Sequence, residues 1–560
     1  MMNKNACMKN EYPYPDFRGM DVTRDENFDS LMNMYIDPDA TDGAIESVVG
    51  YRKCRTMSDG IRSISALDGN LLIHSGRWLY NLPKKGVPKR ITILDGEDSI
   101  SIPLGNRCLM SDGRRMLSVG TNANITTISE DSMIAGCRCA TLHNGRLLLS
   151  GNPDFKGRVF YCEPSDDDIS FTELSELRAY DKEICSLISL DGFLWVFWRS
   201  EGDRGGVICL KNTDDGYATV REIDLTAPMS QVILLGREML FLTESGLMGI
   251  EPTTDGSIAG LKSYSTSINK RLIEKADSLY RLSLWMGYIV IQLDKIIYLI
   301  SPRDNGEYNC FPLIGVGGYK GDRRVFRYKS KADDGYETHY KAGNRAIGEI
   351  YSKAKENGEM IYYSVEEDVS YSVYPTPELS GGQFMPLRGL SSDGRLMWFY
   401  TSDGSIYLFN NDKRGVMPEE IPFYNAINFD IGELGENRIH PLYYSFAGHA
   451  PCYALLTKEV RCRKNRPEEN ADILIDIKKL SDKAIRLIEI ADKEIIYDHV
   501  LSCKNSKKNR KNIVRSNDFV TVSINEHIKK AKTKQLCLMA NDFISPFGLA
   551  YISYETKKKG

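Results

Sequence analysis

A recurring order of hydrophobic and polar positions runs along this chain: an apolar run, an Asp-Gly or Asn-Gly dipeptide, and a second apolar run. This order predicts two antiparallel strands joined by a tight turn, because a type I′ turn needs positive φ at both central residues. The clearest copies are centred on Asp68-Gly69, Asp112-Gly113, Asn144-Gly145, Asp191-Gly192 and Asp393-Gly394. We therefore expect all of these glycines to adopt positive φ.

The spacing of the hairpins predicts the architecture. Further hairpin centres lie at Gly236, Gly287 and Asp403-Gly404. Most neighbouring centres are about 30 to 50 residues apart, a period typical of propeller blades with four short strands each. We therefore predict an all-β fold, a β-propeller of about six or seven blades with almost no helix.

The same pattern divides the chain into three domains. Residues 1–43 lack periodicity and are extended by prolines, which predicts an extended N-terminal arm. The predicted propeller occupies residues 44–436, with an insertion or long-loop region at 303–386 where the hairpin spacing breaks. Residues 437–560 predict a C-terminal β-sandwich-like domain. Its alternating runs are Ile473–Lys478, Ile485–Ile490 and Phe519–Ile524.

Charge and cysteine content exclude several classes of protein. The net charge of −4 gives no general attraction to nucleic acid or to an anionic membrane. The 13 cysteines are scattered and contain no C-x-x-C pair, so we interpret them as reduced, buried small hydrophobes. Met286–Ile300, the most apolar stretch, is short and contains charged residues, which argues against a membrane span. Met1–Cys7 has no apolar region, so we expect no secretory signal and a protein made in the cytoplasm.

Four motifs resemble chemical sites, and for each the structural interpretation is favoured. Glu163 with Asp166–Asp168 could hold a hard cation, but no EF-hand spacing surrounds them, which favours a solvated loop. Gly315–Lys320 lacks the phosphate-loop signature. Ser391–Trp398 is similar to the Asp-box of sialidases, but no residue separates its Asp from its Gly. We interpret His74 as a hydrogen-bonded structural residue of a strand.

No catalytic signature is present either. His440 and His449 flank an aromatic run without an identifiable carboxylate partner, and the chain contains neither H-E-x-x-H nor G-x-S-x-G. We therefore expect neither enzyme activity nor a cofactor nor a metal.

Two groups of residues are candidates for contacts with other molecules. Aromatic side chains of the arm, which no periodic pattern buries, would dock onto a partner. They are Tyr12, Tyr14 and Phe17. Basic side chains of the loop at 504–511 would face DNA if a ring brought several copies together, and would otherwise be solvated. They are Lys507, Lys508, Arg510 and Lys511.

Three sequence motifs, taken in their order along the chain, resemble motifs of a known family. Asn33–Pro38 followed by Ile45–Arg52 is similar to the opening N-x-Y-x-D and E-S/T-x-P-G-(Y/F)-R of phage tail-nozzle and packaged-DNA stabilisation (connector) propeller proteins, with Val49 in place of Pro. Ser150–Pro164, continuing into Leu187–Ser200, resembles their N-x-V-Y-Y-S-E-P strand and the strand pair after it. Met397–Gly415 resembles their L-x-F-x-T-x-D-G-x-I-x-x-F-N-x-D blade.

The resemblance, which spans most of residues 30–460, implies a virion structural protein. It would be a ring subunit of the tail or connector that lines or closes the DNA exit channel. Its partners would be other copies of itself, the portal, adaptor or tail ring, and passing DNA, with no membrane. It would be assembled in the host cytoplasm. The alternative is a propeller enzyme or ligand-binding module that acts on glycans or small molecules through its loop face. A scaffold of the WD type is disfavoured because its Gly-His and Trp-Asp signatures are missing.

Overall fold

The computed structural model describes most of the middle of the chain and shorter segments towards both ends. The described residues are 9–11, 31–32, 34–36, 45–47, 51–84, 86–94, 96, 99–163, 169–174, 177, 181–202, 204–214, 216–229, 231–244, 246–264, 281–293, 296–302, 308–313, 316–320, 324–330, 336–341, 350–354, 360–364, 369–373, 383–409, 453–457, 460–461, 471–478, 485–492, 494–501, 513–515, 519–525, 527–528, 531–540 and 548–556. Among them the single helix is α1 (Ser132–Ala135), capped by the side chain of Asp131. No helix in these residues is long or apolar enough to cross a membrane.

Six sheets of four consecutive strands follow one another along the chain, and we call them blades 1 to 6. Blade 1 contains β6 (Ile61–Leu67), β7 (Asn70–Ser75), β8 (Trp78–Pro83) and β9 (Lys89–Ile93). Blade 2 contains β10 (Ile100–Leu104), β11 (Arg107–Ser111), β12 (Met116–Gly120) and β13 (Ile125–Ser129). Blade 3 contains β14 (Cys139–His143), β15 (Arg146–Ser150), β16 (Val159–Cys162) and β17 (Thr172–Glu173).

The next three blades have the same strand order. Blade 4 contains β18 (Glu183–Leu190), β19 (Phe193–Arg199), β20 (Arg204–Thr213) and β21 (Gly216–Thr226). Blade 5 contains β22 (Ile233–Leu235), β23 (Glu238–Thr243), β24 (Gly246–Pro252) and β25 (Ile258–Ser263). Blade 6 contains β26 (Arg281–Trp285), β27 (Tyr288–Leu293), β28 (Ile296–Pro302) and β29 (Tyr308–Leu313). Strand β29 lies in the range 303–386, for which the hairpin spacing predicted an insertion or long loops.

Blade 7 joins two distant parts of the chain. Strands β36 (Gln383–Ser392), β37 (Met397–Thr401) and β38 (Ser405–Phe409) are consecutive, and β5 (Tyr51–Thr56) lies next to β38 at the edge of the sheet. A fifth strand, β30 (Gly317–Lys320), lies on the other side of β36. The last blade is therefore completed by a strand from near the N-terminus.

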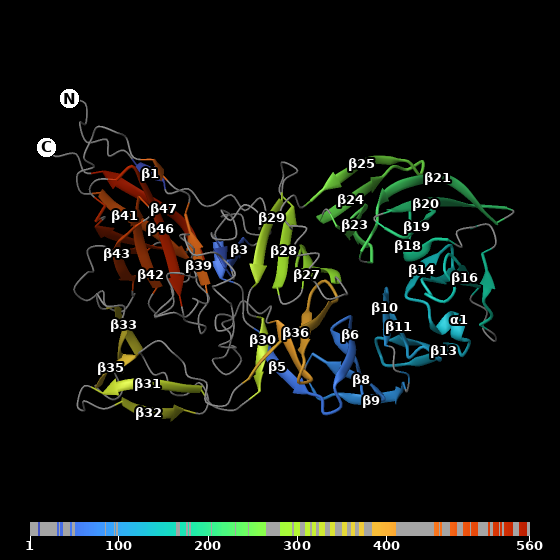
Figure 1. Cartoon of the computed structure of the whole chain (residues 1–560), viewed down its shortest axis with the longest axis horizontal. Coiled ribbons are helices and arrows are strands. Elements are labelled where there is room, and N and C mark those ends of the chain that lie inside the picture. Colours follow the sequence, from blue (N-terminus) through green and yellow to red (C-terminus); the bar gives the residue numbers. More distant parts are fainter. Residues whose placement is uncertain are drawn as a thin grey trace. The chain divides into compact units, whose positions relative to one another are not determined.

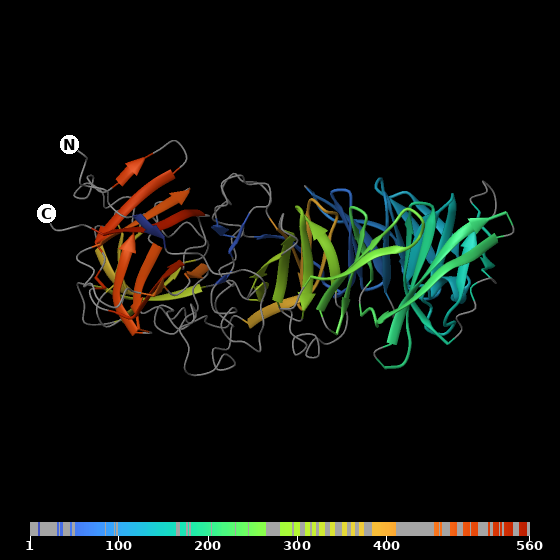
Figure 2. The ribbon, with the colours of Figure 1, turned by 90° about the horizontal axis from the view of Figure 1, so that it is seen from above.

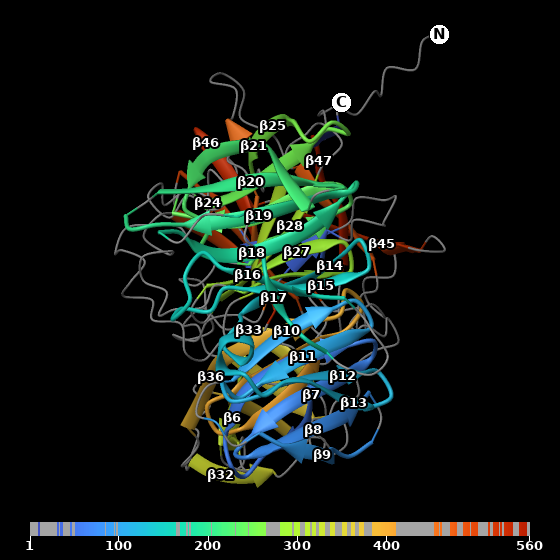
Figure 3. The same ribbon diagram turned by 90° about the vertical axis from the view of Figure 1, so that its right-hand side faces the viewer.

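The blades are arranged around a ring. The first strands of neighbouring blades contact one another, as β6 does with β10, β10 with β14, and β14 with β18. Figure 1 shows the sheets following one another from β6 through β18 and β24 to β36, Figure 2 shows them from above, and in Figure 3 the sheets that contain β7, β11 and β19 face the viewer. This arrangement confirms the predicted all-β propeller, with about seven blades among the described residues.

The predicted turn chemistry is confirmed, and it takes two forms. Gly69, Gly113, Gly145, Gly192 and Gly394 all have φ between 78° and 88°. The residue before Gly69, Gly145 and Gly192 also has positive φ, as a two-residue type I′ turn requires. The aspartates before Gly113 and Gly394 instead accept backbone N–H groups two and three residues ahead, so these turns are longer.

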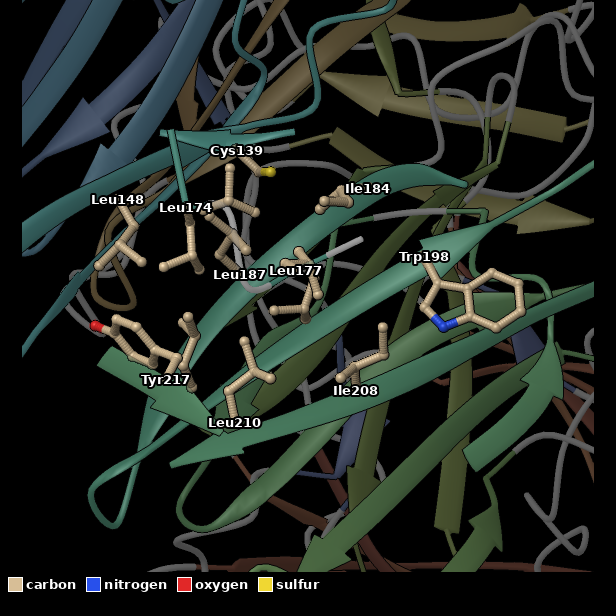
Figure 4. Packing of buried hydrophobic residues seen from close by; sticks show 13 residues of the cluster. Cys139, Leu148, Leu174, Leu177, Ile184, Leu187, Trp198, Ile208, Leu210 and Tyr217 are labelled. Carbon is tan, nitrogen blue, oxygen red and sulfur yellow. The ribbon is translucent and has the colours of Figure 1, made fainter. Parts of the chain in front are cut away.

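Hydrophobic side chains from adjacent blades interlock to form the core. Between blades 3 and 4, side chains of β15 and β16 pack against those of β18, β19 and β20 (Figure 4). Leu148, Val159, Leu194 and Val196 of this cluster have no exposed surface. Burying one such aliphatic side chain contributes about 1.5 to 3 kcal/mol, so the blades hold one another in place through these contacts.

The remaining strands belong to a second compact unit. The units are Lys53–Asn309 with Pro386–Phe409, and Met1–Arg52 with Cys310–Met385 and Asn410–Gly560. In the second unit a seven-stranded sheet has the order β3-β4-β47-β41-β45-β44, with β1 beside β47, and a six-stranded sheet has the order β2-β39-β46-β42-β43, with β40 beside β46. A five-stranded sheet has the order β32-β31-β35-β34-β33.

The strands at the two ends of the chain pair with each other in this unit. The N-terminal strands are β1 (Lys9–Glu11), β2 (Leu31–Met32), β3 (Met34–Ile36) and β4 (Ile45–Ser47). The C-terminal strands are β39 (Tyr453–Leu456), β40 (Val460–Arg461), β41 (Ala471–Lys478), β42 (Ile485–Ala491), β43 (Glu494–Leu501), β44 (Ile513–Arg515), β45 (Phe519–Asn525), β46 (Thr533–Ala540) and β47 (Gly548–Thr556). The three predicted C-terminal runs are therefore confirmed as strands.

Residues of the insertion form a sheet of their own. Its strands are β31 (Arg324–Ser330), β32 (Tyr336–Lys341), β33 (Ile350–Ala354), β34 (Met360–Ser364) and β35 (Val369–Val373). The pattern predicted an extended arm for residues 1–43, and within this range β1 pairs with β47 and β2 with β39. The three-domain division at 1–43, 44–436 and 437–560 stays a prediction.

Candidate functional site

The residues predicted to contact other molecules lie outside the described part of the chain. This holds for the arm aromatics and for the basic loop. They are Tyr12, Tyr14, Phe17, Lys507, Lys508, Arg510 and Lys511. Asp166–Asp168, His440 and His449 lie outside it as well, while Glu163 is described and forms an ion pair of 2.6 Å with Arg146. The candidate sites described below therefore come from the propeller and the C-terminal sheets.

The turn of the Asp-box-like phrase closes the ring. Asp393 Oδ1 accepts hydrogen bonds from the backbone N–H groups of Arg395, at 3.0 Å, and Leu396, at 2.8 Å. Its other oxygen, Oδ2, accepts the backbone N–H of Gly69 at 2.7 Å, in the first turn of blade 1. One carboxylate thus organises its own turn and holds the neighbouring blade, which is a structural role.

The serines before Asp393 extend this contact to both neighbouring blades. Ser391 Oγ accepts the backbone N–H of Ala66 in blade 1 at 2.9 Å. Ser392 Oγ donates to the carbonyl oxygen of Leu284 in blade 6 at 2.7 Å. The backbone N–H of Met286, also in blade 6, donates to the carbonyl of Gly394 at 2.8 Å. The turn at 391–396 therefore connects blades 6, 7 and 1, and we call it the closing turn.

His74 of β7 is the centre of a chain of hydrogen bonds. Its Nε2 lies 3.0 Å from the carbonyl oxygen of Leu94, and its Nδ1 lies 2.8 Å from Ser99 Oγ, which is 2.6 Å from Ser63 Oγ. A carbonyl oxygen only accepts, so Nε2 carries the proton and Nδ1 accepts from the Ser99 hydroxyl. Ser63 must then donate to Ser99.

Burial keeps this imidazole neutral. His74 has no exposed surface, and burial lowers its pKa below the usual 6.5, helped by the charge of Arg62 and opposed by Leu94 O and Asp112. The prediction of a hydrogen-bonded strand histidine is confirmed. Sequence reasoning missed Ser63 and Ser99, because they come from a different strand and from the connection to blade 2. Serine in an otherwise apolar buried strand was the one available signal.

A second buried histidine, His143, has the opposite hydrogen-bond polarity. Its Nε2 lies 3.0 Å from Asn144 Nδ2, an amide nitrogen that only donates, so Nε2 accepts. Nδ1 then carries the proton and donates to Ser189 Oγ of blade 4 at 2.9 Å. Burial is the main cause of the lowered pKa of His143, with Arg146 adding to it. This histidine links blades 3 and 4.

Burial raises the pKa of several of the described cysteines. All nine are free, and burial raises the pKa of Cys108, Cys137, Cys185 and Cys310 to about 12. A protonated thiol is a poor nucleophile and a poor metal ligand, which fits small hydrophobes of the core. Among the described residues, no group of three or more His, Cys, Asp or Glu side chains is placed to hold a metal ion.

Two charged side chains of the described C-terminal strands are fully buried, Glu489 of β42 and Lys534 of β46. Glu489 of β42 accepts the backbone N–H groups of His527, at 2.7 Å, and Ile528, at 3.1 Å, and lies 3.2 Å from His527 Nδ1. The His527 ring stacks on Tyr497 at 3.6 Å between ring centres. The carboxylate satisfies the backbone of this turn, so its role is structural.

Comparisons with known proteins add little beyond the fold. No family model and no curated protein sequence matches the chain. BamB from Moraxella catarrhalis is similar in structure, with a TM-score of 0.34 and 11% identity over 66% of this chain and 99% of that one. Kluyveromyces lactis Hsv2 has a TM-score of 0.31 and 13% identity over 51% and 98%, and the N-terminal domain of Nup159 has 0.28 and 9% over 54% and 95%. Scores this low carry no argument about function.

Proposed function

We propose that this chain is a bacteriophage virion structural protein, a ring subunit of the tail or connector that lines or closes the DNA exit channel. The proposal rests on the sequence resemblance. One structural observation supports it: the first resembling phrase leads into β5, the last forms β37 and β38, and these strands are neighbours in blade 7. Motifs at opposite ends of the resemblance therefore meet in one sheet.

The proposed role implies particular partners for this chain. Other copies of the chain would complete a ring, and portal, adaptor or tail proteins would flank it. A chain of net charge −4 suits a channel that must release phosphate backbones, because tight binding requires clustered basic side chains. A subunit of this kind needs no cofactor and no catalytic turnover.

The test uses a phage whose genome carries this gene. We expect mass spectrometry of purified particles to find the chain in a fixed ratio to the portal, and electron microscopy to locate it as a ring. A variant lacking residues 1–24 should keep the propeller folded but fail to enter particles, since the arm aromatics would anchor it. Particles that lack the chain altogether and remain infectious would contradict the proposal.

A further inference from the structure

We propose that Ser99 is a nucleophilic serine that accepts an acyl group from small activated esters, with His74 as its general base. Ser99 Oγ lies 2.8 Å from His74 Nδ1, the distance of a hydrogen bond to a base. The Leu94 carbonyl, 3.0 Å from Nε2, orients the ring and fixes its tautomer. This is the order of nucleophile, base and orienting group that nucleophilic sites require. The inference goes beyond the proposed virion role and does not depend on it.

The burial of the three groups favours this chemistry. His74 and Ser63 are buried, whereas Ser99 is partly exposed and is therefore the member of this chain of hydrogen bonds that a reagent can reach. Ser63 donates to Ser99 Oγ at 2.6 Å, which holds the oxygen in place while its proton points at the imidazole.

The reaction balances with the groups named. Ser99 Oγ attacks the carbonyl carbon of the ester, and its proton passes to His74 Nδ1. The bond between the carbonyl carbon and the leaving oxygen breaks, and the leaving group takes the proton from Nδ1. The products are an acyl ester on Ser99, a neutral His74 and a free alcohol or phenol. No oxidant, metal or cofactor takes part.

The chain contains its own matched control. Ser189 is also partly exposed and lies 2.9 Å from Nδ1 of a buried histidine, His143. There the imidazole donates, because Nε2 accepts from the Asn144 amide. An Nδ1 that already carries a proton cannot take one from the hydroxyl, so Ser189 should stay unreactive.

The experiment treats the full chain with p-nitrophenyl acetate, follows release of p-nitrophenolate, and maps the acetylated peptides by mass spectrometry. We expect one hydroxylamine-sensitive acetyl ester per chain on Ser99 and none on Ser189. Ser99→Ala should abolish the ester, and His74→Gln should slow its formation roughly 100-fold, the usual contribution of a general base. His143→Gln should leave the rate unchanged.

Two results would overturn the proposal. One is a folded wild-type chain whose Ser99 carries no acetyl ester after treatment. The other is equal acetylation of Ser99 and Ser189, which would mean that the imidazole tautomer has no effect. Both comparisons use the wild-type chain, so they decide the question even where His74→Gln fails to fold. Circular dichroism and melting curves check the folding of each variant.

Discussion

Asp393 Oδ2 accepts a hydrogen bond of 2.7 Å from the backbone N–H of Gly69, a residue 324 positions earlier in the chain. This bond joins blade 7 to blade 1, where the ring closes. Blade 7 is built from the two ends of the propeller, since β36, β37 and β38 come from its C-terminal side and β5, which runs on into β6 of blade 1, comes from its N-terminal side. Contacts between blades 7 and 1 should therefore contribute more to the free energy of unfolding than similar contacts between other blades.

Replacing Asp393 tests how much the contact between blades 7 and 1 stabilises the fold. In Asp393→Ala the N–H groups of Gly69, Arg395 and Leu396 lose a charged acceptor. We expect the free energy of unfolding to fall by about 2 kcal/mol or more, measured by urea denaturation. Asp68→Asn is the control, because Asp68 is exposed and Asn tolerates its φ of 44°. Equal stability of the two variants would show that the closing turn contributes nothing.

Removing β5 tests how blade 7 is completed. We compare chains that begin at Tyr51 and at Met57, which both lack β1 to β4 and differ only by β5. Without β5, the fully buried strand β38 becomes an exposed sheet edge, and exposed apolar edges aggregate. We expect the shorter chain to elute as aggregates in size-exclusion chromatography and to melt at lower temperature. Two chains that behave alike would mean that the ring closes without β5.

Substitutions at two glycines distinguish the stability cost of backbone strain from that of a steric clash. Gly145 has a φ of 79° and open space where a Cβ would lie, so Gly145→Ala should cost about 1 kcal/mol through strain alone. At Gly206 a Cβ would lie 2.5 Å from the Ile223 carbonyl oxygen and 2.6 Å from the Trp198 ring. Gly206→Ala should therefore cost about 3 kcal/mol. Gly145→Asn, which suits the type I′ turn, should be nearly neutral in the same unfolding experiment.

The buried histidines predict loss of stability in acid. Burial lowers the folded-state pKa of His74 and His143 below the value of 6.5 expected in the unfolded chain. Below pH 6.5 the unfolded state therefore binds more protons than the folded state. The stability that the neutral histidines contribute above pH 6.5 is lost as the pH falls towards and through the folded-state pKa values. We expect the urea midpoint of unfolding to fall as the pH is lowered from 7.5 to 5, a range that extends about one unit or more on either side of 6.5. The double variant His74→Gln, His143→Gln should show a weaker dependence, and an identical slope would refute this origin.

The sequence by itself determined the local structure. Asp-Gly and Asn-Gly dipeptides between apolar runs specify hairpins through φ alone, and a repeated hairpin specifies a propeller because neighbouring blades must bury each other's faces. The positive φ values at Gly69 and Gly145 follow from this local chemistry. Burial of most of the described cysteines likewise follows from their positions in apolar stretches of the chain.

Only the tertiary structure decided which distant groups meet. That β5 completes blade 7 and that Asp393 holds Gly69 depend on the ring closing, whereas the contact of Ser99 with His74 depends on how the start of blade 2 packs against blade 1. No short-range sequence pattern encodes these contacts. The tertiary structure also decides which atom donates the hydrogen bond in the Ser99–His74 and Ser189–His143 pairs. It is set by the third group on each ring, the Leu94 carbonyl in one case and the Asn144 amide in the other.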